Sequence, residues 1–160
     1  MHKTHNDISE KVRIQMAGLL QERLADAIDL MTQAKQAHWN VKGPNFIALH
    51  ELFDKVYENA TEYPDLLAER IAQLGGTSEG TVRAVAGRSK LPEYPLAITA
   101  GHDHVVALSR SLAAFGAYVR QAIDRADEIG DKDSADIFTE ISRAVDKDLW
   151  FVEAHLQAER

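Results

Sequence analysis

Four side chains that commonly bind metal ions share one face of a helical stretch in the first half of the chain. They are His50, Asp54, Asp65 and Glu69. Because each residue of an α-helix turns by about 100°, these four lie at about 0°, 40°, 60° and 100° around the axis. Imidazole and carboxylate groups in such a row could hold a divalent transition-metal ion.

The four side chains form two pairs that are too far apart to bind one ion within one chain. Asp54 and Asp65 are eleven residues apart, or about 16 Å along a helix, whereas a metal–ligand bond of this kind is about 2 Å long. If a second copy of the helix packs antiparallel across a two-fold axis near Asn59 and Ala60, each pair meets the partner's other pair. Two sites would then form per dimer.

His38 could complete each site, because only a short turn separates it from His50. Two imidazoles and three carboxylates suit iron(II), with manganese(II) or zinc(II) as competitors. The chain has no cysteine, which excludes thiolate zinc sites, iron–sulfur clusters and cysteine nucleophiles. It also lacks any Glu-x-x-His pair, so a di-iron site inside one bundle is not expected. Two simpler interpretations stay open: a solvated charged helix face, and a hydrogen-bonded core histidine at position 38.

Apolar residues three or four apart predict four long helices that would position these side chains. The helices are expected from about Val12 to Trp39, from Phe46 to Leu74, across 105–129, and from Asp133 or Ser134 to about Leu156. The connection over residues 75–95 is unusually long and has room for one short helical turn. No stretch shows the period-two alternation of a strand. Short first and last loops with a long crossover predict an all-α, ferritin-like four-helix bundle.

Length and composition favour one globular domain over residues 1–160. The chain is 45% hydrophobic and 27% charged, which is ordinary globular composition. Its net charge of −7 has the wrong sign for binding nucleic acid by bulk charge. Because no secretory signal or membrane-spanning apolar run is visible, the expected compartment is the cytoplasm, without membrane contact.

Several longer motifs resemble those of the Dps family, the DNA-protection proteins of starved cells, also called mini-ferritins. The family signature contains two His, two Asp and one Glu separated by 11, 3, 10 and 3 residues, and this chain matches every spacing. The matching segments are His38-Trp39-Asn40-Val41-Lys42-Gly43-Pro44-Asn45-Phe46, Leu49-His50-Glu51, Phe53-Asp54, Asp65, Ala68-Glu69-Arg70, Leu74-Gly75-Gly76 and a block within 135–155. The resemblance covers nearly the whole chain.

This resemblance implies both an assembly and an activity. In Dps proteins twelve four-helix subunits form a hollow shell, with ferroxidase centres at the two-fold interfaces. The resemblance implies that His38, His50 and Asp54 come from one subunit and Asp65 and Glu69 from its neighbour, with Asp54 and Glu69 as the closest ligands. Iron(II) would be oxidised there, preferably by hydrogen peroxide, and stored as ferric mineral in the cavity. Removing iron and peroxide together suppresses hydroxyl-radical formation.

Other residues gain roles only through the same resemblance. Trp39 would adjoin the site as an electron donor or radical trap, although it could equally pack the helix end. Asp131, Asp136 and Glu140 repeat the spacing of acidic residues that line a three-fold iron-entry pore in relatives. From the sequence alone, these three acids form only an exposed N-terminal turn of the last helix, where acids suit the helix dipole.

Two local features run against this pattern. Pro64 directly precedes Asp65, and a proline inside a helix is expected to kink or break it at a cost of about 3 kcal/mol. Asp65 would then be displaced, which affects the oxidation rate more than assembly. His102 and His104 flank Asp103 and invite a metal interpretation, but positions two apart on a helix face apart. Both histidines are therefore predicted to lie on the surface.

DNA binding is the second function that the family suggests. Residues 1–13 contain three basic and two acidic side chains, and residues 1–8 are expected to form a short flexible arm. Such arms would bind DNA weakly, with strong salt dependence and help only from multivalency. The alternatives to an iron-oxidising shell are thus a DNA-compacting shell with weak iron chemistry, associated with the nucleoid, and a cage for a different metal.

Overall fold

The computed structural model describes residues 1–157 and is built almost entirely from helices. They are α1 (Glu10–Asn40), α2 (Phe46–Gln73), α3 (Val82–Ala86), α4 (Gly101–Ile129) and α5 (Lys132–Glu153). The described part contains no strand, only an isolated bridge between Lys42 and Ala100. None of its helices is long and apolar enough to cross a membrane. The prediction of four long helices with a short turn in the crossover is confirmed.

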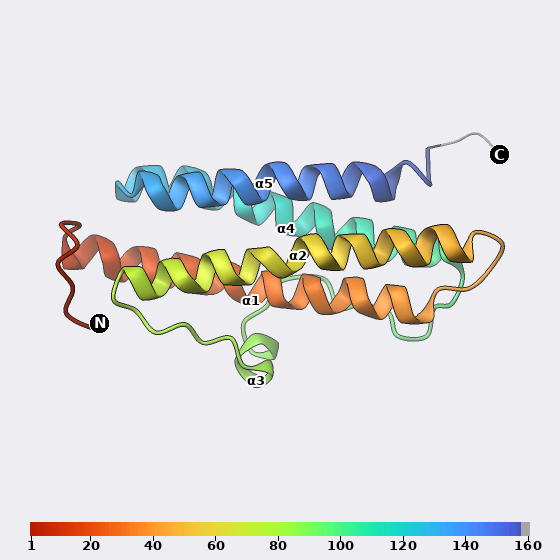
Figure 1. Cartoon of the computed structure of the whole chain (residues 1–160), viewed down its shortest axis with the longest axis horizontal. Helices are drawn as coiled ribbons and strands as arrows, with labels where there is room; N and C mark the ends of the chain where they lie inside the picture. The colour runs from red at the N-terminus through yellow and green to blue at the C-terminus, as the bar shows by residue number, and fades with distance from the viewer. Residues whose placement is uncertain (158–160) are drawn as a thin grey trace.

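The four long helices form two antiparallel hairpins that pack against each other (Figure 1). The first hairpin is α1 with α2 and the second is α4 with α5. Phe53, Phe115 and Phe138 are fully buried between the helices. Removing such apolar side chains from water is the main stabilising term of a core of this kind.

The crossover between α2 and α4 runs the length of the bundle along α1 (Figure 1). Polar side chains of α1 bind it at successive points. The buried Asp26 accepts a hydrogen bond of 2.8 Å from the Lys90 backbone, and Gln33 donates one of 3.0 Å to the Pro92 carbonyl. These bonds satisfy backbone groups that a long irregular segment would otherwise leave unpaired.

Helix α5 differs from its prediction at both ends. It begins at Lys132, one or two residues early, because Asp131 is the N-cap and accepts a hydrogen bond of 3.2 Å from the Ser134 N–H. It ends at Glu153, before the apolar pattern reaches Leu156. Asp131 is also buried and forms an ion pair of 2.8 Å with Arg70. The expectation that Asp131 lies on an exposed turn is therefore wrong, whereas Asp136 and Glu140 are exposed.

Helix α2 continues through Pro64 without interruption. The predicted local break is therefore wrong, and Asp65 lies within the continuous helix, whereas the predicted kink stays a prediction. The proline costs the bond to the Ala60 carbonyl, but Tyr63 and Leu67 are buried on either side of it. Tertiary packing of this kind contributes more to helix stability than a single backbone bond.

The first nine residues have no regular structure but contact the end of α2. The His2 N–H donates a hydrogen bond of 2.6 Å to the Gly75 carbonyl. Arg13 donates one of 2.9 Å to the Leu74 carbonyl and another of 3.0 Å to the Ile8 carbonyl. The expected flexibility of residues 1–8 stays a prediction.

Candidate metal centre

His38 and His50 form a half-buried pair where the first hairpin turns. His38 is in the last turn of α1 and His50 is in the second turn of α2. Their rings stack with centroids 3.7 Å apart and planes at 24°. His38 Nδ1 lies 2.8 Å from the His50 carbonyl oxygen, and His50 Nδ1 lies 2.9 Å from the His38 carbonyl oxygen. The two imidazoles are thus held by crossed hydrogen bonds.

These bonds determine which ring nitrogens are free. A carbonyl oxygen only accepts hydrogen bonds, so each Nδ1 must carry the proton. In the neutral ring Nε2 then keeps its lone pair, which is the state that a metal-binding histidine requires. A backbone carbonyl on the other ring nitrogen is the usual outer partner of such a ligand. Each ring could therefore bind a metal ion through its Nε2 atom.

Asp54 follows one helical turn after His50 and lies beside the pair. Its Oδ1 is 3.9 Å from His38 Nδ1, and the same oxygen accepts a very short hydrogen bond from Lys35 Nζ. This hydrogen bond from Lys35 lowers the pKa of the Asp54 carboxyl from its usual value. The carboxylate is consequently ionised at neutral pH and can act as a metal ligand.

Asp65 and Glu69 lie on the same exposed side of α2 as Asp54, but further along the helix. Within residues 1–157 no three His, Asp or Glu side chains are grouped closely enough to hold an ion. His38, His50 and Asp54 lie near one another but do not form a metal site alone, and Asp65 and Glu69 lie apart from them. This is the arrangement expected if a second subunit supplies the missing carboxylates.

The predicted two-fold axis near Asn59 and Ala60 stays a prediction. Ala60 is 1% exposed, and Asn59 donates a hydrogen bond of 2.8 Å to Asp148 on α5. Both are turned toward their own bundle. At this level Glu58 is exposed and Thr61 is half-buried.

Comparison with known proteins bears on the fold and the family. The ferritin-like domain model matches residues 17–160. The DNA protection during starvation protein of Agrobacterium fabrum is 48% identical over 156 residues, which cover 98% of this chain and 96% of that protein. The chain belongs to the Dps family. The corresponding protein of Mycolicibacterium smegmatis is 34% identical, over 94% of this chain and 82% of that protein.

Solved structures agree with this assignment to the Dps family. Dps from Mycobacterium smegmatis in a tetragonal form superposes with a TM-score of 0.93 at 33% identity and covers 99% of this chain and 95% of its own. Dps from Microbacterium arborescens in a high iron form gives 0.87 at 36% identity, over 94% and 98% of the two chains. The predicted ferritin-like fold is confirmed.

Sequence reasoning missed one residue beside the candidate centre, Lys35. It lies three residues before His38 on α1, so the two side chains share a helix face. A spacing search for metal ligands overlooks an ammonium group, because a protonated lysine cannot donate a lone pair. The i, i+3 relation to His38 was the available signal.

The remaining predicted residues of this Dps chain take varied positions. Trp39 is 66% exposed beside His38, and the nearby Phe46 and Ile47 are 42% and 62% exposed. Exposed apolar side chains beside an incomplete candidate site are typical of a protein–protein interface. Asp136 and Glu140 are four residues apart on α5 and share a helix face.

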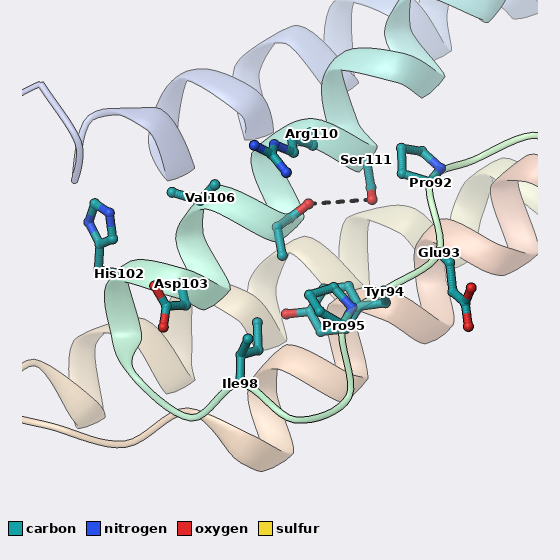
Figure 2. Close-up of a pocket in the computed structure, with 11 residues that line it drawn as sticks. Pro92, Glu93, Tyr94, Pro95, Ile98, His102, Asp103, Val106, Arg110 and Ser111 are labelled. Carbon is teal, nitrogen blue, oxygen red and sulfur yellow. Dashed lines mark hydrogen bonds between the residues drawn. The ribbon is translucent and has the colours of Figure 1, made fainter.

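The prediction that His102 and His104 both lie on the surface is right for His102 and wrong for His104. His102 is exposed and lines a hollow of about 260 Å³ between the crossover and α4, whose lining includes none of the five predicted ligands (Figure 2). His104 is 1% exposed, and its Nδ1 lies 2.7 Å from the Tyr94 hydroxyl. Its Nε2 makes no hydrogen bond within the described residues. Helix positions two apart do face different directions, but the crossover covers the face of α4 that carries His104, and the prediction did not include this contact.

His104→Gln is expected to change how stability depends on pH. Burial lowers the pKa of His104, with Tyr94 and Asp103 as neighbouring titratable groups. Below about pH 6.5 the unfolded chain therefore binds more protons than the folded chain, so acidification destabilises the wild type through this residue. The variant should be less stable by about 1 kcal/mol at pH 7.5 through the altered Tyr94 bond. Urea unfolding at fixed protein concentration should show this difference in the free energy of unfolding narrowing toward pH 5.5. A difference that does not change with pH would contradict the lowered pKa of His104.

Proposed function

We propose that this chain is a subunit of a hollow dodecameric shell that oxidises iron(II) and stores the product as ferric mineral. The observation that carries the proposal is the crossed histidine pair, in which each Nδ1 bonds to the other residue's carbonyl oxygen and leaves Nε2 as the ring nitrogen that could bind a metal ion. Asp54 Oδ1 lies 3.9 Å from His38 Nδ1 and adds a carboxylate beside the pair. Membership of a family that is generally iron-oxidising supports the same conclusion.

Each site would be completed across a two-fold axis. Antiparallel packing of two α2 helices places the first half of one helix beside the second half of the other. One subunit would then contribute His38, His50 and Asp54, and its neighbour would contribute Asp65 and Glu69. Two imidazoles and three carboxylates prefer iron(II) or a similar borderline ion. Asp54 and Glu69 are proposed as the ligands nearest the iron, as the resemblance to Dps proteins implies.

The proposed reaction uses iron as substrate and hydrogen peroxide as oxidant. Two iron(II) ions each give up one electron, and one peroxide molecule takes up both electrons and two protons to leave as two water molecules. The protein positions the ions, while the carboxylates offset the charge that increases on each iron during oxidation. The fixed histidine rings lower the reorganisation needed when the ions bind.

Storage and entry would follow from the charge of the assembled shell. The net charge of −7 per chain attracts cations toward the cavity. The exposed Asp136 and Glu140 are proposed to line a three-fold iron-entry pore, with Asp131 contributing through its contact with Arg70. Trp39 is proposed as an electron donor or radical trap near the site.

Protection of DNA would result from this chemistry without direct contact with DNA. Consuming iron and peroxide together removes the reactants that form hydroxyl radicals in the cytoplasm, where we place the protein. The N-terminal segment is nearly balanced in charge, and His2 binds Gly75. Direct DNA binding would therefore be weak and lost at moderate salt.

Stopped-flow spectroscopy of ferric product formation tests the proposal. The assembled protein should oxidise iron(II) with hydrogen peroxide faster than with dioxygen and much faster than buffer alone does. Ferric product should remain with the protein in size-exclusion chromatography. Rates equal to those of buffer would contradict the proposed function.

A further inference from the structure

In the described part of the chain, residues 93–98 of the crossover are joined to the rest of the protein by one hydrogen bond. The Tyr94 hydroxyl lies 2.7 Å from His104 Nδ1 on α4. Tyr94 also lines the hollow between the crossover and α4, so this segment is not packed continuously against that helix (Figure 2). The contact between Tyr94 and His104 therefore holds the segment to the bundle.

Both ends of the segment are anchored by other contacts. Gln33 donates a hydrogen bond of 3.0 Å to the Pro92 carbonyl, and the Lys42 N–H donates one of 2.9 Å to the Thr99 carbonyl. Residues 93–98 could thus move away from α4 while the chain on either side of them stays in place.

His104 lies in a position that suits only the neutral form of its ring. It is 1% exposed, and among residues 1–157 its Nε2 has no hydrogen-bond partner. Because a hydroxyl donor gives shorter hydrogen bonds than an N–H donor, the separation of 2.7 Å favours Tyr94 as the donor and Nδ1 as the acceptor. Protonation would occupy the Nδ1 lone pair and so remove that acceptor. It would also leave a buried charge, which is costly unless it is fully paired.

The groups around the ring do not offset this cost. The charge of Asp103 on α4 and the backbone of Asn40 and Ile98 favour protonation, while α2 contributes the apolar Phe53 ring, with centroids 6.4 Å apart. Burial outweighs these effects and lowers the pKa of the histidine. At neutral pH the ring is therefore uncharged and can accept the hydroxyl bond.

We propose that Tyr94 and His104 form a pH-sensitive latch, which holds residues 93–98 on α4 at neutral pH and releases them when His104 takes up a proton. Opening gives the charged ring access to water and so removes the cost of burying it. In the open form the ring regains the ordinary histidine pKa of about 6.5, so the closed form is most favoured above that pH and loses stability as the pH falls below it. Release would widen the hollow in Figure 2 and uncover part of the α4 face beneath the crossover.

Hydrogen–deuterium exchange of the assembled protein, measured by mass spectrometry, tests this latch. In the wild type, the opening of peptides that cover 93–98 should increase by about five- to ten-fold from pH 7.5 to 5.5, after correction for intrinsic exchange. His104→Gln and His104→Asn cannot take up the proton, so their change should stay below about two-fold. His102→Gln is the matched control, because His102 is exposed on the same helix and its replacement should leave the wild-type response.

Peptides from the middle of α1 provide the reference and should keep their protection over the same pH range. Equal loss of protection in α1 and in the crossover would mean that the whole bundle opens, which would overturn a local latch. The same pH response in the wild type and in both His104 variants would overturn the role of the histidine. Sedimentation velocity at both pH values verifies that all chains form the same assembly. Because the experiment contains no iron, either result leaves the proposed metal centre to its own test.

Discussion

Replacing Asp54 and Glu69 together by alanine is expected to slow oxidation of iron(II) by hydrogen peroxide by about 100-fold or more. Loss of an outer partner of a metal ligand already costs about 10–100-fold, and this variant loses a proposed direct ligand on each side of every site. The histidine pair would remain, because its crossed bonds involve only backbone carbonyls. Stopped-flow absorbance of the ferric product measures the effect.

The matched control replaces Glu58 and Glu62 by alanine. These acids are exposed on the same helix but lie outside the proposed ligand set. This variant should oxidise iron at nearly the wild-type rate, provided that sedimentation shows the same assembly. Equal slowing in both double variants would mean that bulk negative charge, rather than a defined centre, drives the reaction.

Arg70→Leu is expected to lower the free energy of unfolding by about 3–5 kcal/mol, because it leaves a buried carboxylate without its partner. Arg70 is 6% exposed and donates 2.8 Å and 3.0 Å hydrogen bonds to Asp131 and Ser134. These bonds join the end of α2 to the start of α5. Guanidinium unfolding at a fixed protein concentration measures the loss.

Arg120→Leu provides the control for an ion pair of the same length on the surface. Arg120 binds Asp146 at 2.8 Å, but the two side chains are 49% and 55% exposed. Exposed pairs of this type contribute about 0–1 kcal/mol. Adding Asp131→Asn to the Arg70 variant should recover part of its loss, because the unpaired charge is removed. Similar losses for Arg70→Leu and Arg120→Leu would show that burial is not the cause.

The sequence predicted the helices well, because their apolar residues follow the helical period closely. Its failures occurred where a tertiary contact decided the outcome. Asp131 is buried because Arg70, sixty-one residues away, reaches it. His104 is buried because the crossover folds over α4 and brings Tyr94 to its ring. Neither contact leaves a periodic signal in the sequence.

Pro64 illustrates the same point in the opposite direction. A local rule predicted a break in α2, yet the helix is continuous. The buried Tyr63 and Leu67 hold this part of the helix against the core. Packing can therefore offset the lost backbone bond, which a single-residue rule does not include.

At the candidate metal centre the spacing of the proposed ligands was predictable, whereas their hydrogen bonds were not. Helix geometry placed His50 and Asp54 on one face and predicted that a second chain is needed to complete a site. The crossed hydrogen bonds of His38 and His50 depend on how the α1–α2 turn closes, which spacing does not describe. The contact of Lys35 with Asp54 likewise joins two helices.

The central claim is that every site is shared between two subunits, and co-assembly of two inactive variants tests it most directly. One chain carries Asp54→Ala and the other Glu69→Ala, each with a different tag, and mixed shells are purified through both tags. At a mixed interface one site loses both residues while the other keeps both. Random mixing should therefore restore about a quarter of the wild-type sites and a corresponding rate of peroxide-driven iron oxidation. Mixed shells that are as inactive as either variant alone would contradict the account.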